Sequence, residues 1–142
     1  MPLVAITRLR VRSWRYLPMF FLQGLRSARQ AAAAKAISRL GCLRDRQNTF
    51  WTGTIWTTDT AMKDFMLSGV HRHVMRKLPL WCDEAAVVHW MQESTEAPTW
   101  AEAHARLRRE GRPSRVNHPS PAHLAYEFPK PRVRPTAEKR FK

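Results

Sequence analysis

Several features that define common protein classes are scarce in this 142-residue sequence. It has two cysteines, Cys42 and Cys82, too few for a disulfide framework, and neither belongs to a closely spaced Cys/His set that would hold structural zinc. None of its five glycines falls in a phosphate-cradling loop, which argues against a nucleotide-dependent enzyme. No run approaches the roughly 20 apolar residues of a bilayer span. We therefore expect a cytoplasmic protein with no membrane partner.

Acidic residues are also scarce, and their distribution is uneven. The net charge is +14, with ten Lys/Arg against one acid in residues 1–46, four against six in residues 47–96, and eleven against four in residues 97–142. A nucleic-acid module usually gathers its charge on one recognition element, whereas this charge lies at two ends. The acid-free beginning also fits a presequence or signal peptide, but a strand predicted there favours a mature domain. We expect a solvated basic tail, with a polyanion site as the alternative.

The hydrophobic pattern predicts an α+β fold. Alternating apolar residues indicate four strands, at 3–12, 38–44, 50–56 and 85–91. Helical spacing indicates helices at 17–32, at 59–68 with a further turn or two at 70–78, and at 98–111. The order β-α-β-β-α-β is ferredoxin-like, with a four-stranded antiparallel sheet and both helices on one side.

The chain divides into three predicted parts. Residues 1–96 form the ferredoxin-like barrel domain, and residues 97–111 form a C-terminal helix. Residues 112–142 hold six prolines and eight Lys/Arg, which is typical of an extended or disordered basic arm.

Apolar residues occupy both faces of the first, third and fourth strands. The helices explain the burial of one face only, and an exposed apolar sheet face is an association surface. Two such sheets closing face to face would bury it. We therefore expect a homodimer that encloses an apolar space between the sheets, which is a dimeric α+β barrel.

Four strings of residues resemble a known superfamily. They are SWRYLPMFFLQGLRSARQA (13–31), LRDRQNTFWTGTIWTTDTAMKDFMLSGVHRHVM (43–75), WCDEAAVVHW (81–90) and EGRPSRVNHPS (110–120). They are similar to antibiotic-biosynthesis-monooxygenase-like dimeric α+β barrels, and within these to small bacterial proteins related to spheroidene monooxygenase. The resemblance implies a dimer with a lumen pocket. Relatives include cofactor-free oxygenases of polycyclic aromatics, haem-degrading and haem-using enzymes, and proteins with no assigned reaction, so the cofactor is either none or haem.

Two histidines are candidate catalytic residues. His71 lies where the family string reads Ser-Gly-x-His, and the resemblance implies a general base there, or a metal ligand if haem is bound. The alternative is that His71 caps the preceding helix or bonds a carbonyl group. His89 lies in a strand beside Val87 and can project into the lumen, although a buried strand histidine is more often satisfied by a neighbour.

Two tryptophans of the third predicted strand are candidates for contacting a ligand. Trp51 and Trp56 fall on opposite faces, so one faces the helices and the other the lumen. An aromatic wall suits a planar polycycle or a porphyrin. Core packing is the alternative for both side chains.

Two arginines lie on strands or at their ends and are candidate anion anchors. A guanidinium group can hold a carboxylate or propionate through two parallel hydrogen bonds, and Arg8 and Arg44 are placed for this at the barrel mouth. For Arg44 the alternative is a local pair with Asp45 or with the carboxylates at 83 and 84.

The resemblance, together with these residues, implies a small monooxygenase-like protein that binds a planar hydrophobic ligand (polycyclic aromatic, polyene or haem) at the dimer interface. The catalytic candidates are His71, His89 and Arg44, and the ligand-binding candidates are Arg8, Trp51 and Trp56. Cofactor-free oxygenation needs only a dry pocket, one base and orientation, because the substrate anion supplies the electrons. The alternative is a non-catalytic binding or accessory protein whose basic arm docks on an acidic partner or, less in keeping with the charge pattern, nucleic acid.

Overall fold

The structure, a computed structural model, describes the backbone of residues 1–142 and all side chains except those of Val70 and Pro135. Its single sheet is antiparallel throughout, with the strand order β5-β4-β1-β3-β2-β6. The strands are β1 (Leu3–Val11), β2 (Ile37–Asp45), β3 (Thr49–Trp56), β4 (Cys82–Met91), β5 (Arg112–Pro113) and β6 (Glu138–Arg140). The inner order β4-β1-β3-β2 is that of the predicted ferredoxin-like α+β fold, which is therefore confirmed.

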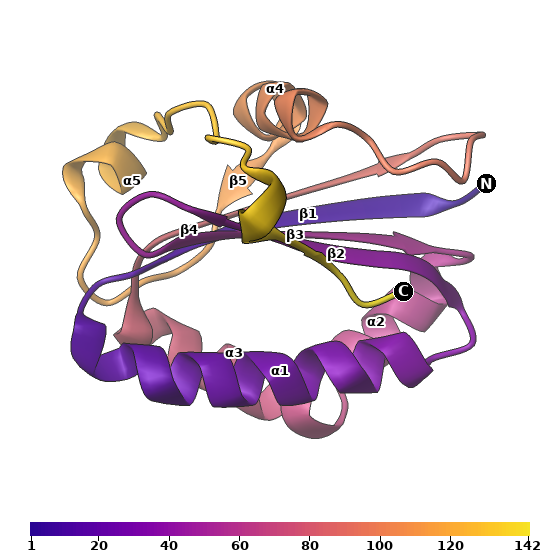
Figure 1. Ribbon diagram of the computed structural model, residues 1–142, viewed down its shortest axis with the longest axis horizontal. Helices are drawn as coiled ribbons and strands as arrows, with labels where there is room; N and C mark the ends of the chain where they lie inside the picture. Colours follow the sequence, from indigo (N-terminus) through magenta and orange to yellow (C-terminus); the bar gives the residue numbers. More distant parts are fainter.

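The helices lie on both faces of the sheet (Figure 1). They are η1 (Trp14–Tyr16), α1 (Leu17–Ala33), α2 (Asp59–Met66), α3 (Gly69–Trp81), α4 (Trp100–Glu110), α5 (Pro121–Ala125) and η2 (Pro135–Ala137). Helices α1, α2 and α3 cover one face, and α4, α5 and the C-terminal segment cover the other (Figure 1). We call these the helix face and the C-terminal face.

Local chemistry explains where several elements begin and end. Thr58 caps α2, because its hydroxyl accepts a hydrogen bond from the backbone N–H of Ala61 at 3.1 Å. The β2–β3 hairpin turns through Gln47 and Asn48, both with positive φ, as the two central residues of a tight hairpin turn require. These polar residues lie in the predicted loop between two β-type runs.

Helix α3 is longer than the sequence predicts. We expected it to end before Pro79, but it continues to Trp81. Backbone groups from other segments satisfy its last carbonyls: the N–H of Arg12 donates to Trp81 at 2.8 Å, and the N–H of Asn117 donates to Pro79 at 2.8 Å. These tertiary hydrogen bonds support a final turn that a proline would otherwise weaken.

The sheet has six strands, so the prediction of four is wrong. Both additional strands come from residues 112–142, where β5 pairs with β4 and β6 pairs with β2. Phe128 of the same segment is buried in the core. Residues 112–142 therefore lie against the sheet and do not form a free arm, because the apolar C-terminal face offers them a large surface to cover.

The two faces contain separate hydrophobic clusters. On the helix face, side chains of α1 and α2 pack on the sheet around Leu3, Ala5, Ala31, Ile37, Leu40, Trp56 and Met62. On the C-terminal face, α4 and Phe128 pack on Val4, Ile6, Leu43, Trp51, Ile55, Ala86, Val88 and Trp90. The second set belongs to the face that we expected a partner subunit to cover, and here the same chain covers much of it.

Candidate ligand-binding site

A pocket of about 420 Å³ lies on the C-terminal face, where the start of α4 and the last residues of the C-terminal segment meet the sheet. Val4, Ile6 and Ile55 form an apolar floor but are almost fully buried, so the accessible apolar lining comes from Pro98, Trp100 and Val133. Gly53 of β3 lets Ile6 and Trp100 pack closely on the sheet. A Cβ atom there would lie 3.2 Å from the Ile6 side chain and 3.7 Å from the Trp100 ring.

Positive charge gathers at the rim of this pocket. Arg39, Arg140 and Lys142 line it together with a single carboxylate, Glu138. The Arg39 Nε donates to the carbonyl of Thr95 at 3.1 Å. The Lys142 Nζ donates to the carbonyl of Ala34, between α1 and β2, at 2.9 Å. Within the described part of the chain, none of the three cations lies within 4.0 Å of a carboxylate oxygen. The rim can therefore attract an anionic group on a ligand.

Arg8 and Trp51, two predicted ligand-binding residues, come together on the same face but outside this pocket. The Arg8 guanidinium carbon lies 5.8 Å from the centre of the Trp51 ring and 4.4 Å from the centre of the Phe128 ring. Both residues are buried. Phe128 thus occupies the position over Arg8 where a planar ligand would stack, and this end of the predicted lumen is filled by the chain itself.

A buried carboxylate, Glu84, explains why Arg8 is held there. Its Oε1 accepts from Arg8 Nη1 at 2.7 Å, and its Oε2 accepts from Arg10 Nη1 at 2.8 Å and from the hydroxyl of Ser120 at 2.7 Å. Burial alone would raise the pKa of Glu84, but the hydrogen bonds from Arg8 and Ser120 and the charges of the two arginines outweigh it and lower that pKa. Ser120 belongs to the C-terminal segment, so this cluster fastens the segment to β1 and β4.

Trp56 and His71 lie on the helix face, on the opposite side of the sheet from the pocket. The ring of Phe65 connects them, with its centre 5.2 Å from Trp56 and 4.5 Å from His71. Burial lowers the pKa of His71, although a hydrogen bond to the backbone of Met66 opposes this shift. With Trp51 and Trp56 both buried in the core, core packing accounts for both tryptophans.

His89 also lies on the helix face, because its neighbours in β4, Val88 and Trp90, point to the other side. It is half-buried, and its pKa is lowered by burial and by the charge of Arg112. Neither His71 nor His89 lines the 420 Å³ pocket. The described residues therefore do not place a histidine where haem in that pocket would need one.

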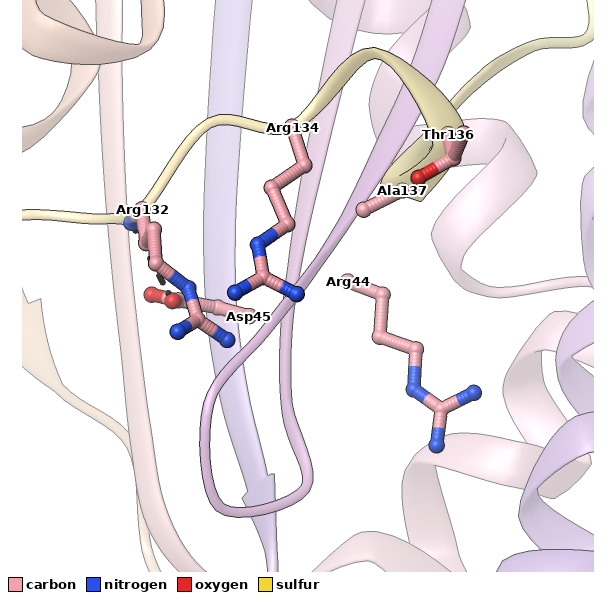
Figure 2. A pocket seen from close by; sticks show the side chains of 6 residues that line it. All are labelled: Arg44, Asp45, Arg132, Arg134, Thr136 and Ala137. Carbon is pink, nitrogen blue, oxygen red and sulfur yellow. Dashed lines mark hydrogen bonds between the residues drawn. The ribbon is translucent and has the colours of Figure 1, made fainter.

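Arg44 lines a smaller pocket of about 250 Å³ beside the β2–β3 hairpin. Figure 2 shows the guanidinium groups of Arg132 and Arg134 near Asp45, whereas Arg44 points away from them. The Arg44 guanidinium carbon lies 5.9 Å from the ring centre of Phe21 on α1. In the described residues Arg44 forms none of the ion pairs that we considered as alternatives.

Asp45 is a second anchor of the C-terminal segment. One of its oxygens accepts from the Trp51 Nε1 at 3.2 Å, and the other accepts from the backbone N–H of Arg132 at 3.1 Å and of Arg46 at 2.8 Å. Its carboxylate therefore joins the hairpin, the buried tryptophan and the covering segment. This side of the site is structural in role.

Sequence reasoning missed the residues that shape the pocket. Trp100 falls within the predicted helix 98–111, Arg39 within the predicted strand 38–44, and Arg140 and Lys142 within the predicted basic arm. The sequence does contain one signal for structure in the C-terminal segment. A serine followed by a proline, as in Ser120 and Pro121, commonly begins a helix. In the structure Ser120 caps α5 by accepting from the N–H of His123 at 3.1 Å.

No three side chains of the His, Cys, Asp and Glu types are grouped so that they could hold a metal ion in the described part of the molecule. Nor is any described helix both long enough and apolar enough to span a bilayer.

The fold is shared with several solved structures of low sequence identity. The chain is similar to SnoaB, a cofactor-independent oxygenase from Streptomyces nogalater, with 16% identity and a TM-score of 0.56, over 68% of this chain and 98% of that one. A candidate antibiotic biosynthesis monooxygenase from Nitrosomonas europaea has 12% identity and a TM-score of 0.59, over 68% and 94%. Rv0793 from Mycobacterium tuberculosis has 10% identity and a TM-score of 0.60, over 68% and 100%.

No curated protein sequence matches the chain. A family model described as a domain of unknown function, DUF3291, matches residues 21–139, which is most of the sequence. The structural neighbours confirm the antibiotic-biosynthesis-monooxygenase-like fold, while the finer resemblance to spheroidene monooxygenase stays a prediction. The chain therefore belongs to the DUF3291 family and has the fold of antibiotic-biosynthesis-monooxygenase-like proteins.

Proposed function

We propose that this protein is a monooxygenase-like protein that binds a planar hydrophobic molecule, as its phenolate or carboxylate anion, in the 420 Å³ pocket. The observation that carries this function is the combination of an apolar floor with a cationic rim on the C-terminal face. The fold supports it, because one protein of the same fold is a cofactor-independent oxygenase.

The pocket suits a small aromatic ligand in size and lining. Ligand pockets measure about 300–1,000 Å³ and are mostly apolar with a few placed polar groups. The rings of a fused aromatic molecule can lie against Trp100, with Pro98 and Val133 beside them. Aromatic rings packed in this way gain about 0.5–1.5 kcal/mol beyond the burial of their area.

The rim cations provide the chemical part of the proposal. Arg39 and Arg140 would stabilise the anionic form of a phenol and so lower the pKa of the bound ligand. An aromatic anion can pass electrons to dioxygen, which converts a ring CH₂ group to C=O and releases the second oxygen atom as water. Glu138 is the one side-chain carboxylate among the lining residues and is the candidate base for the proton.

A non-catalytic binding protein is the second candidate function. It is favoured by the positions of His71 and His89, which lie across the sheet from the pocket. The two functions share the ligand and differ in the reaction. Oxygen uptake on adding anthrone, abolished in Glu138→Gln, would support the enzyme. Tight binding of anthrone without oxygen uptake would support the binding protein.

The homodimer stays part of the proposal, but the pocket does not depend on it. The residues assigned to the pocket all belong to one subunit, and a partner subunit that packs on the same face would add to its walls. Sedimentation velocity over a range of concentrations tests the dimer.

The binding experiment compares the affinity of the protein for 1-naphthol with its affinity for the uncharged methyl ether. Tryptophan fluorescence reports the binding, and the Trp100→Phe variant shows which part of the signal comes from Trp100. We expect naphthol to bind more tightly than the ether. Loss of a charge-assisted hydrogen bond weakens binding by about 1.5–3 kcal/mol, so Arg39→Ala with Arg140→Ala should reduce the affinity at least tenfold. Arg108→Ala with Arg109→Ala, two exposed arginines of α4 outside the pocket, is the matched control. Equal binding of both compounds, or an unchanged affinity in the pocket variant, would contradict the site.

A further inference from the structure

The outer surfaces of α1 and α3 carry positive charge, and neither of these two helices contains an aspartate or a glutamate. The third helix of the layer, α2, carries the exposed Asp59 and Asp64. The exposed cations are Arg26, Arg29, Arg72, Arg76 and Lys77. None of them forms an ion pair with another described residue. Helix α4 on the opposite side is different, because its Arg106 pairs with Glu102 and Glu110.

Large apolar side chains are exposed on the same layer. Trp14, in the turn before α1, is 76% exposed, and five side chains of α1 and α3 are more than 40% exposed: Met19, Phe21, Leu22, Met75 and Leu80. The two helices form one continuous surface, because Phe20 of α1 packs with Val74 and Leu78 of α3 beneath it. The surface therefore combines unpaired cations with exposed apolar groups, which we call the basic-apolar surface.

We propose that this basic-apolar surface docks on an anionic lipid bilayer. Amphipathic helices that lie in a membrane interface carry Lys and Arg beside Trp, Leu and similar side chains, with the apolar groups entering the boundary of headgroups and acyl chains. Clustered cations bind anionic headgroups electrostatically. We predicted no membrane partner because no segment can span a bilayer, but binding to the surface of a bilayer requires no span.

Two other occupants fit the surface less well. A second copy of this chain would oppose five cations to five cations with no carboxylate on either helix, and like charges at an interface are unfavourable. A nucleic acid would neutralise the cations through its phosphates but would leave Trp14, Met19 and Leu22 without apolar contacts. An anionic bilayer satisfies both kinds of side chain.

The experiment measures co-sedimentation of the full chain with phosphatidylcholine vesicles, with and without phosphatidylglycerol. We expect binding to the anionic vesicles only, weakened by added salt. Arg72→Ala with Arg76→Ala should reduce vesicle affinity about tenfold or more. Arg108→Ala with Arg109→Ala removes the same charge from α4 and should change it little. Equal loss in both variants, or equal binding to neutral vesicles, would overturn the assignment.

A second set of variants tests the apolar contribution. Trp14→Ala and Leu22→Ser alter exposed side chains and leave the partly buried Phe20 in place, so both should fold and both should bind vesicles severalfold more weakly. Brominated lipids should quench the fluorescence of Trp14. This contribution is identified as the part of the signal that is absent in Trp14→Phe. If the affinity is unchanged in both variants and duplex RNA displaces the vesicles, the surface binds nucleic acid and the lipid assignment is wrong. The pocket variant Arg39→Ala with Arg140→Ala should bind vesicles normally, which separates this surface from the proposed ligand site.

Discussion

The two faces of the sheet are covered in different ways. The helix face is covered by α1, α2 and α3, which lie between the strands in the chain, and its main cluster is apolar, with Trp56, Ile37 and Met62 at the centre. The C-terminal face is covered by a segment that follows the last long strand. Its cover combines apolar contacts of Phe128 and Leu107 with polar anchors at the buried Glu84 and the partly exposed Asp45.

This difference indicates that the second cover is an addition to a shared unit. Strands β1 to β4 and their helices span residues 3–91, and the similar solved structures cover between 65% and 69% of this chain while nearly all of each of those proteins is matched. The 420 Å³ pocket lies where this cover meets β2 and the start of α4.

The largest expected effect comes from deleting residues 112–142, which removes β5, α5, β6 and Phe128. Each fully buried large apolar side chain contributes about 1.5–3 kcal/mol, and the deletion would expose several of them, including Trp51 and Val88, and leave Glu84 without Ser120. The expected loss is therefore a large share of the stability of about 5–15 kcal/mol typical of a domain. Thermal unfolding followed by circular dichroism measures it.

Sedimentation velocity of the same deletion variant shows what replaces the cover. We expect dimers or larger assemblies, because the uncovered apolar face can bury itself against a second copy. Deletion of residues 139–142 alone, which keeps Phe128 and Ser120, is the control. A deletion variant that remained monomeric and as stable as the full chain would show that this segment does not cover the face.

The anchor at Glu84 has the next largest expected effect. Glu84→Ala leaves Arg8 buried without its carboxylate, and breaking a buried ion pair on one side costs about 3–5 kcal/mol. The matched control is Glu102→Ala on α4, whose ion pair with Arg106 is exposed and whose loss costs about 0.3–0.5 kcal/mol. Urea unfolding of both variants measures the difference. Similar losses would mean that the buried cluster contributes no more than a surface pair.

Sequence periodicity predicted the unit that the two faces share, but not the second cover. The alternation of β3 placed Trp51 and Trp56 on opposite faces of the sheet, and the structure has them there. The apolar residues on both faces indicated a missing cover, and a partner subunit satisfies that pattern as well as a segment of the same chain does. The six prolines of residues 112–142 then favoured disorder, because the surface that orders this segment is distant in the sequence.

The candidate site was predicted less well, for a similar reason. His71 follows from a resemblance of local residues, but its side chain is turned into the helix layer by its contact with Phe65. The pocket depends on residues that are separated by most of the chain, such as Arg39 and Arg140. No local pattern links them, since their proximity arises only when β6 pairs with β2.

The smallest expected effect concerns acid sensitivity of the helix face. An unfolded histidine binds a proton near pH 6.5, and burial lowers the pKa of His71 in the folded protein. Between these two pKa values the unfolded state binds more protons, so the free energy of unfolding should fall as the pH falls below about 6.5.

His71→Phe keeps an aromatic ring beside Phe65 and removes the titration, so its stability should depend less on pH across this window. His73→Gln, at an exposed position of the same helix, is the control, and NMR titration of the His71 ring gives the folded pKa directly. Because burial also lowers the pKa of His89, some pH dependence should persist in His71→Phe. If the free energy of unfolding of that variant changed with pH as steeply as that of the unaltered chain, the acid sensitivity would belong to other groups.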